Sequence, residues 1–440
     1  MLGITSFFLL ATEVLHWDLT FTTGLSAKNV AIYLVATFIA LRMIVGRASL
    51  MAAGRMQSAF IVLIAYAIIT WVIAAVLIEY PGYQLVASGI RLKANLVDYY
   101  IFFAVFLFGV QNSEDAVKVI KWILAGAVFA NLMTCLDASG IVHMGYQERI
   151  DGRQQGAIGE SNQYAAYIDL FLPGIIAAAV NARGIKRLAW VGGVFVSVGA
   201  LVMTASRGGF VGLIIACAVG AYLYRHLVSY SRAAGWVLGS LAVFVLFMSF
   251  SNYGGLLSER VFGQTASIDA NEASSGRTEI WAALFYTMFQ NPITVITGFG
   301  WNVYWSLPFH FSPHNHYFAL WFNLGLVGLG LGCYLLFGAI GRARRASLIA
   351  QPPLRSYFIA YVIGGIGIAG AVFFVDLYTP WNFFWMYTGV IIRLALCVAE
   401  APAPVPAALE RRSRARLPKA RRDPYGWAGA TDDSSGRKPA

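Results

Sequence analysis

The chain has 440 residues, of which 58% are hydrophobic and only 12% are charged, whereas soluble domains carry about 25% charged residues. This composition excludes a soluble enzyme, a disordered chain and a small disulfide-stapled secreted domain. The net charge of +11 would indicate nucleic-acid binding in a soluble protein, so in this apolar chain it is first tested against membrane topology.

Long apolar runs predict an all-α polytopic membrane protein with about twelve transmembrane helices, because about 20 apolar residues cross the hydrocarbon core. The first run is the weakest, since it contains Glu13 and His16. It is not expected to be a secretory signal, because no basic residue precedes it. Two glycine-rich runs, 325–332 and 364–370, favour close helix packing. The predicted spans lie near 3–20, 29–46, 57–79, 96–111, 117–136, 161–181, 188–205, 208–225, 234–251, 316–340, 356–376 and 380–398.

The cations predict which side of the membrane each loop faces. Short loops rich in Lys and Arg stay in the cytoplasm, and 24 of the 32 cations fall on the side that holds both termini. That side is therefore predicted to be cytoplasmic. The transmembrane domain is expected over 1–400 and a basic, disordered cytoplasmic tail over 401–440. The eight predicted external cations are Lys28, Arg91, Lys93, Arg149, Arg153, Arg207, Arg260 and Arg277.

Two external loops are long enough to hold a site: about 137–160 and, between the ninth and tenth spans, one large loop over 252–313. The large loop ends in a segment that contains His310, His314 and His316. Three interpretations are open from the residues: anchoring at lipid headgroups, a zinc site, or a general base. Neutral imidazole can accept a proton from an attacking hydroxyl, and no acidic residue nearby completes a zinc motif, so no metal is expected.

Three external arginines accompany this histidine segment. Arg277 follows a serine pair at a predicted helix start, where backbone N–H groups favour an anion; a solvated or ion-paired side chain is the alternative. Arg207 lies in the Ser-Arg-Gly-Gly turn 206–209, predicted as a tight two-glycine hairpin; its guanidinium either binds phosphate or snorkels to the interface. Arg153 lies in the shorter loop, whose acids and bases can also neutralise one another. A basic ring beside imidazole at a lipid boundary suits the transfer of a group from a pyrophosphate.

The same residues carry a family resemblance. His314-Asn315, nine residues and then Gly325 and Gly328 resemble the His-Asn-x9-Gly-x-x-Gly signature of the bacterial O-antigen ligases and their polymerase relatives. The turn 206–209 resembles the Ser-Arg-Gly-Gly turn of that superfamily. Ser275-Gly276-Arg277 and the residues that follow it are similar to a third block of the family, and the blocks occur in the family's order.

The resemblance implies an integral membrane glycosyltransferase of the bacterial inner (cytoplasmic) membrane, with a periplasmic active site and no metal or cofactor. Its donor would be a glycan on undecaprenyl diphosphate. Its acceptor would be the lipid A core of lipopolysaccharide in a ligase, or a second lipid-linked glycan in an O-antigen or exopolysaccharide polymerase. Membrane lipids are expected partners, and nucleic acid is not.

Site roles carry over by position in the motifs. His314 matches the general base, and Arg207 and Arg277 match the diphosphate-binding arginines. Attack from the face opposite the diphosphate would invert the anomeric carbon. A further set of substrate contacts is expected with less support from the motifs: Arg153, Asn315, His316 and Tyr317.

One position departs from the family pattern, because Asn323 stands where many relatives have a glutamate, which puts any acidic partner of the base in doubt. The chain size and the single long loop favour a ligase over a polymerase. A polysaccharide or lipid transporter is a more distant alternative, for which the apolar spans offer Asp98, Asp169 and Asp376 as intramembrane acids.

Overall fold

The computed structural model describes residues 2–16, 20–46, 53–147, 152–226, 276–307, 312–377 and 379–400, besides the isolated positions 235, 238, 239, 242 and 255. The chain divides into two compact units, Met1–Ala399 and Glu400–Ala440. The predicted span 234–251, apart from isolated positions, and the predicted tail 401–440 lie outside the described residues.

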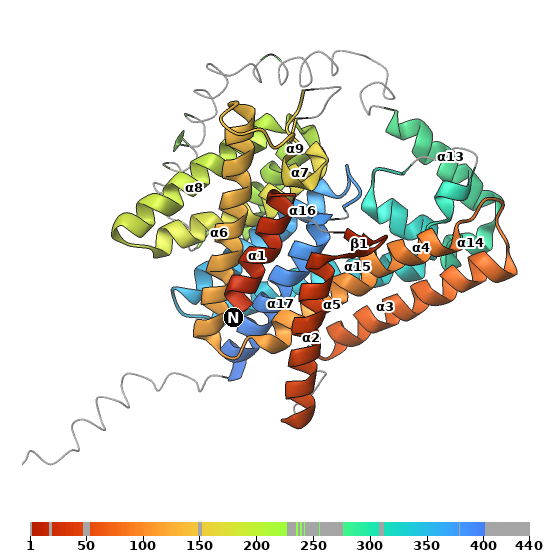
Figure 1. Ribbon diagram of the computed structural model, residues 1–440, viewed down its shortest axis with the longest axis horizontal. Helices are drawn as coiled ribbons and strands as arrows, with labels where there is room; N and C mark the ends of the chain where they lie inside the picture. Colours follow the sequence, from red (N-terminus) through yellow and green to blue (C-terminus); the bar gives the residue numbers. More distant parts are fainter. Residues whose placement is uncertain are drawn as a thin grey trace, which may run out of the picture. The chain divides into compact units, whose positions relative to one another are not determined.

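Helices follow one another through the first unit in the order that Figure 1 colours from red to blue. The N-terminal elements are α1 (Leu2–Val14), the antiparallel hairpin β1 (Thr20–Thr22) and β2 (Leu25–Ser26), α2 (Ala27–Val45), α3 (Arg55–Val72) with the π-helical turn η1 (Ile73–Leu77), α4 (Leu85–Leu92) with the π-helical turn η2 (Lys93–Val97), α5 (Asp98–Gly109) and α6 (Ser113–Ala138). The remaining elements are η3 (Gly156–Ile158), α7 (Ser161–Asn181), α8 (Gly184–Met203), α9 (Arg207–Leu223), α13 (Arg277–Gln290), α14 (Pro292–Thr297), η6 (Val303–Ser306), α15 (His316–Ile349), α16 (Leu354–Ala371) and α17 (Thr379–Glu400).

Each predicted span within the described ranges coincides with a helix. Among the described residues, nine helices are long and apolar enough to cross a membrane, and α1 and α9 are shorter apolar helices. These helices confirm an all-α polytopic membrane protein, because a lipid-exposed backbone must satisfy its hydrogen bonds within each segment. The total of twelve spans and the side that each loop faces stay predictions.

The fourth predicted span, 96–111, begins earlier than expected. The π-helical turn η2 joins α4 to α5, so that Leu85–Gly109 forms one continuous apolar helix. Arg91 and Lys93, which were expected outside the span 96–111, therefore lie within this helix. Both side chains have partners that let them lie within a helix: Lys93 Nζ is 2.9 Å from Asp98 Oδ2, and Arg91 Nη1 donates to Asn302 Oδ1 at 3.2 Å.

The largest hydrophobic core surrounds α7, which is buried along most of its length and packs against α8, α9 and α16. Aromatic rings join it to α17, where Tyr167 contacts Phe383 and Phe171 contacts Tyr387. The glycine run 364–370 brings α16 close to α7, because a Cβ on Gly364 would lie 2.2 Å from the Leu170 carbonyl oxygen. Close packing predicted from this run is confirmed.

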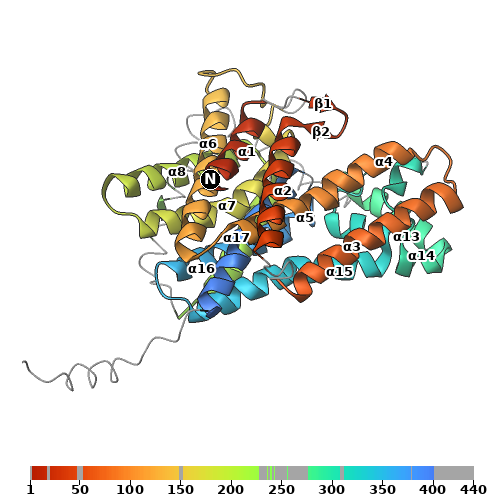
Figure 2. The same cartoon turned by 60° about the horizontal axis from the view of Figure 1, so that its bottom comes forward.

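A second, smaller hydrophobic cluster lies within the predicted loop 252–313. It is built from Leu284 and Met288 of α13, Phe299, and Phe318 and Phe322 of α15, together with neighbours from η1 and η6. In Figure 2, α13 and α14 lie beside α15 and α3 on the side of the first unit away from α8. The described part of this loop, 276–307, is therefore a folded layer that packs on the helices beneath it.

Candidate functional site

His314 is the exposed imidazole of the histidine segment and lies directly before α15. Its backbone adopts a left-handed conformation (φ +47°), and its N–H donates to Ser312 Oγ at 3.4 Å. Trp281 of α13 supports the same loop, since its indole N–H donates to the Pro313 carbonyl at 2.7 Å. The His316 backbone N–H donates to the Val372 carbonyl beyond the end of α16 at 2.9 Å. The loop that presents His314 is thus held from two sides.

The three residues after His314 make contacts within the protein. Asn315 caps α15, because its Oδ1 accepts from the Phe318 N–H at 3.0 Å. The Tyr317 hydroxyl donates to the Ala369 carbonyl at 2.8 Å. The His316 ring packs on Trp381, with 5.1 Å between ring centroids. These contacts indicate that Asn315 and Tyr317 fix the start of α15. His310, the first histidine of the segment, lies outside the described residues.

Arg207 is the first residue of α9, and Ser206 is its N-cap, with Oγ accepting from the Gly209 N–H at 3.2 Å. The predicted two-glycine hairpin is wrong, because both glycines lie in the first turn of the helix. Their small size is needed for packing: a Cβ on Gly209 would lie 2.4 Å from the Ala165 Cβ of α7. The glycines let the N-terminus of α9, and with it Arg207, approach α7 closely.

Arg277 is the first residue of α13 and lies half-buried next to other charged groups. Burial lowers the pKa of its guanidinium, and the charge of Arg207 lowers it further, whereas Glu160 and Asp376 raise it. Each of these three groups therefore lies near enough to Arg277 to influence its charge. Arg207, one of the three, is 70 residues away in the sequence. Two arginines whose charges influence one another favour an anionic ligand.

Asp376 belongs to this cluster, and sequence reasoning missed it. It was interpreted as an intramembrane acid, but α16 ends at Ala371 and Asp376 lies between α16 and α17, 4% exposed. Its Oδ2 accepts from the Ser312 hydroxyl, the same hydroxyl that accepts from the His314 N–H. Burial raises the pKa of this carboxyl, while the Ser312 hydrogen bond, the charge of His314 and the nearby backbone N–H groups act in the opposite direction. Asp376 therefore lies next to the His314 loop and is connected to the His314 backbone through the Ser312 hydroxyl.

The other two intramembrane acids have different surroundings. Asp98 is paired with Lys93 and also accepts from Tyr33 and Asn29. Asp169 lies fully buried in α7. Neither residue lies among the charged groups that influence Arg277.

Arg153 is buried, and its hydrogen bonds support the turn 206–209 that carries Arg207. Its Nε donates to the Thr204 carbonyl at 2.8 Å, and its Nη2 donates to Asn162 Oδ1 at 3.0 Å. The same Asn162 oxygen accepts from the Ser206 hydroxyl at 2.9 Å. Arg153, which is 5% exposed, thus connects the shorter loop to the N-cap of α9.

A kink in α15 explains the first glycine of the His-Asn-x9-Gly motif. Gly325 has φ +64° and ψ −168°, and a Cβ there would lie 2.0 Å from the Ile296 carbonyl oxygen. Gly298 packs against the same kink, where its Cβ would lie 2.3 Å from the Asn323 carbonyl oxygen. Only glycine combines this backbone conformation with such close contact. The close packing predicted for the run 325–332 is therefore confirmed at Gly325, which in addition bends α15 around α14.

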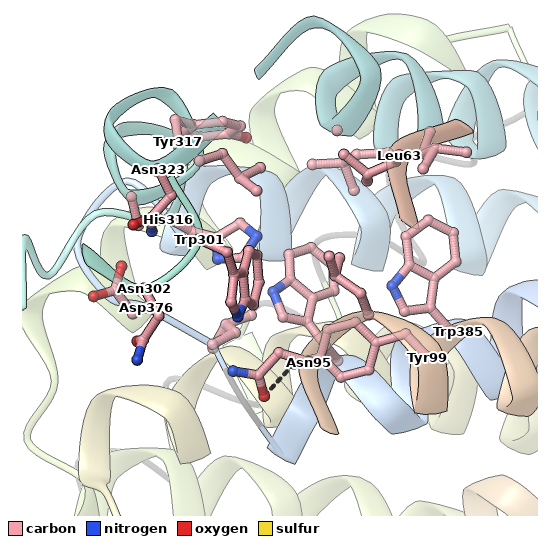
Figure 3. A pocket seen from close by; sticks show the side chains of 18 of the residues that line it. Leu63, Asn95, Tyr99, Trp301, Asn302, His316, Tyr317, Asn323, Asp376 and Trp385 are labelled. Atoms are coloured by element: carbon pink, nitrogen blue, oxygen red, sulfur yellow. Dashed lines mark hydrogen bonds between the residues drawn. The ribbon is translucent and has the colours of Figure 1, made fainter. Parts of the chain in front are cut away.

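A cavity of about 90 Å³ extends from His316 and Asp376 into the helices, and we call it the aromatic cavity. In Figure 3, His316, Asn302 and Asp376 lie toward one end of it and Leu63 and Trp385 toward the other, with Trp301 between them. Asn323, the residue that departs from the family pattern, is 6% exposed and also lines this cavity. Other lining residues include Tyr99, Tyr304, Tyr317 and Trp381.

Among the residues that the structure describes, no group of three His, Cys, Asp or Glu side chains is arranged to hold a metal ion. His314 is exposed, whereas His316 is half-buried against Trp381.

One comparison with known proteins gives a match. The sequence model of a family described as O-antigen ligase matches residues 192–333, which run from α8 to the middle of α15. This stretch contains Arg207, Arg277 and His314 but neither Arg153 nor Asp376. No curated protein matches the chain. The family match confirms the resemblance that the sequence motifs carry.

Proposed function

We propose that this chain, a multi-pass membrane protein whose residues 192–333 match the O-antigen ligase family, transfers a glycan from undecaprenyl diphosphate to the lipid A core. The family match supports glycosyl transfer of the ligase or polymerase type in general. The proposal rests on one observation above all: Arg207 and Arg277 each begin a helix and interact through charge, and Arg277 also interacts with Asp376, which contacts the loop of His314.

The arginines would bind the diphosphate of the donor. A helix N-terminus already favours an anion, and a guanidinium adds two parallel N–H donors that match phosphate oxygens. As the glycosidic bond breaks, the diphosphate keeps the electron pair of the C–O bond, and its extra negative charge develops beside Arg207 and Arg277. Such positioned donors typically contribute about 10²–10³ in rate each. In this mechanism the two arginines provide the positive charge, so the reaction needs no metal.

His314 would act as the general base on the acceptor. Its imidazole takes the proton from an acceptor hydroxyl, whose oxygen forms the new bond to the anomeric carbon, an effect typically worth about 10²–10⁴ in rate. Attack opposite the leaving diphosphate inverts that carbon. Asp376 would stabilise the imidazolium by its charge and hold the His314 backbone through Ser312, whereas Arg153 would position Arg207 through the turn 206–209. The site would face the periplasm of the inner membrane, where lipid-linked glycans and the lipid A core are both accessible.

A polymerase remains the second candidate, because the same residues would serve an acceptor that is itself lipid-linked. Reconstitution of the full chain in vesicles with a labelled undecaprenyl diphosphate glycan distinguishes the two functions. We expect label on added lipid A core and release of undecaprenyl diphosphate, with unchanged rates in a chelator. Label on a second lipid-linked repeat would assign a polymerase instead. Loss of activity in the chelator would contradict metal independence, and no product with either acceptor would favour a transporter.

A further inference from the structure

The aromatic cavity contains four buried polar atoms that have no hydrogen-bond partner among the protein atoms. Two are donors, the indole N–H groups of Trp301 and Trp381, and two are acceptors, Asn323 Oδ1 and Asp376 Oδ1. The four side chains are between 3% and 8% exposed, so bulk water does not reach them freely. Buried polar groups are nearly always paired, and leaving one unpaired costs about 1–3 kcal/mol. A set of unpaired groups in one cavity indicates a ligand that pairs with them.

The combination of donors and acceptors restricts the chemistry of that ligand. An isoprenoid tail would leave all four groups unpaired, and a phosphate would meet two acceptors that repel it. A hydroxylated ligand can donate to Asn323 and Asp376 and accept from the two indoles. The walls offer apolar faces as well, because Trp381 and Trp385 stack with centroids 6.2 Å apart and Phe60 packs on Trp385 at 4.7 Å. A sugar ring has both properties, with hydroxyl groups on its rim and C–H groups on its faces.

A second, polar cavity lies beside the aromatic cavity, and we call it the polar chamber. It measures about 310 Å³ and is lined by Ser26, Asn29, Lys93 and Asp98, among others. Asn95 lines both cavities, and Trp381 and Asn382 are consecutive residues that line one each. The aromatic cavity therefore has polar surroundings beside it as well as at the end near His316.

We propose that the aromatic cavity binds one pyranose ring of a glycan substrate, held by the indole N–H groups of Trp301 and Trp381 and by Asn323 and Asp376. The inference rests on the proposed glycosyl transfer and identifies a sugar subsite for it. Pockets for drug-sized ligands measure about 300–1,000 Å³, so a cavity of about 90 Å³ would admit no more than one ring of a glycan. The ring belongs either to the donor or to the acceptor, and both present the same chemistry to these residues.

Binding to the full chain in lipid nanodiscs tests this subsite with three probes. The first is a short-chain polyprenyl diphosphate, the second is the same lipid carrying one N-acetylhexosamine, and the third is deacylated lipid A core oligosaccharide. Trp381→Phe keeps a ring but removes the N–H, so we expect it to weaken one or both sugar-bearing probes about five- to tenfold. Affinity for the sugar-free diphosphate should not change. Weaker binding of the second probe assigns the subsite to the donor, and weaker binding of the third probe assigns it to the acceptor.

Two further variants and one control complete the test. Trp301→Phe and Asn323→Leu should act in the same direction as Trp381→Phe, which guards against a single variant that fails to fold. Trp122→Phe is the matched control, because Trp122 lies on α6, is 43% exposed and should leave all three affinities unchanged. Unchanged affinities for both sugar probes in the cavity variants would overturn the proposal and leave a cavity that holds only water. An equal loss with the sugar-free lipid would also overturn it, in favour of an isoprenoid site.

The proposed transfer can fail separately from the subsite. Arg207→Ala with Arg277→Ala should weaken the sugar-free diphosphate, and if that probe binds unchanged, the diphosphate-binding role is wrong. The lipid A core oligosaccharide carries no polyprenyl diphosphate, so its dependence on Trp301 and Trp381 still reports on the cavity.

Discussion

Two neighbouring regions meet near His314 and differ in how they can hold a substrate. On one side, Arg207, Arg277 and Glu160 interact through charge and lie at the starts of three helices. On the other side, the aromatic cavity has unpaired but mostly uncharged donors and acceptors among aromatic rings. Asp376 belongs to both regions, since it influences Arg277 and also lines the cavity.

The difference indicates a division of the substrate between the two regions. Charge attracts an anion over several ångströms and tolerates some freedom of position, whereas neutral hydrogen bonds in a buried cavity require close fit. A glycan on a lipid diphosphate contains both kinds of group. The bond to be broken joins the anionic part to the sugar, so His314 would lie where the two regions meet.

Substitution of Arg207 and Arg277 is expected to lower the transfer rate more than the substitutions described below. Arg207→Ala combined with Arg277→Ala should lower the transfer rate by at least about 10²-fold, because both donors to the leaving diphosphate are lost. The paired lysine variants should recover part of the rate, since lysine keeps the charge but not the bidentate geometry. Initial rates in the reconstituted assay check this order. Retained donor affinity and turnover in the double alanine variant would contradict the diphosphate role.

Substitution of Asp376 tests whether the arginine side and the aromatic cavity are coupled through His314. Asp376→Asn removes the negative charge beside the imidazole, so we expect kcat to fall, by up to about 10²-fold if the imidazole is misplaced. KM for the donor should stay within about twofold, because the arginines are unchanged and asparagine keeps an oxygen that can accept from a sugar hydroxyl in the aromatic cavity. Ser312→Ala, which removes the hydroxyl between the Asp376 carboxylate and the His314 backbone N–H, should lower kcat less. A rise in KM with unchanged kcat would instead limit Asp376 to holding sugar in the aromatic cavity, with no role at the base.

The kink of α15 should affect stability more than chemistry. Gly325→Ala places a Cβ against the Ile296 carbonyl and demands a backbone conformation that costs about 1–3 kcal/mol in a non-glycine residue. We expect a lower melting temperature of the purified protein and several-fold slower transfer. Gly330→Ala on the same helix is the control, because a Cβ there meets no atom within 4 Å and should leave the melting temperature unchanged or raise it. Equal melting temperatures for both variants would show that the kink is not needed.

Arg153 should give the smallest effect on transfer. Arg153→Met removes the hydrogen bonds to the Thr204 carbonyl and to Asn162, of which Asn162 keeps the one from Ser206, so we expect a loss of about 1–3 kcal/mol of stability and a shift of the turn that carries Arg207. Transfer should slow by a few-fold, with no change in the affinity for the sugar-bearing probe relative to the sugar-free one. A loss of transfer rate as large as that in the Arg207 and Arg277 double variant would instead indicate that Arg153 contacts the substrate.

The helices could be predicted from the sequence because each long apolar run has one outcome in a membrane. Their ends were less predictable, since Lys93 and Asp98 pair within one helix and so extend it beyond its apolar run. His314, Arg207 and Arg277 were found because each lies in a short motif at a loop or helix start. Their proximity was not predictable from spacing, since it depends on how α9, α13 and α15 pack.

Two parts of the site left no pattern in the sequence. Asp376 lies 62 residues after His314 and approaches it only because α15 and α16 form an antiparallel pair that returns the chain to the same end. The aromatic cavity is assembled from α3, α5, α15, α17 and the segment before η6, each of which contributes one to several residues. Asn323 was noted only as a departure from the family, whereas its buried, unpaired side chain indicates a use of its own.

The most direct test of the base and diphosphate roles is His314→Ala, assayed for donor binding and glycan transfer in the same reconstituted vesicles. We expect donor affinity within about twofold of the unmodified protein and transfer reduced by at least about 10²-fold, because the arginine pair is intact while the proton acceptor is missing. Transfer at the unmodified rate would contradict the role of His314 as the base. Loss of donor binding would contradict the separation of the two roles.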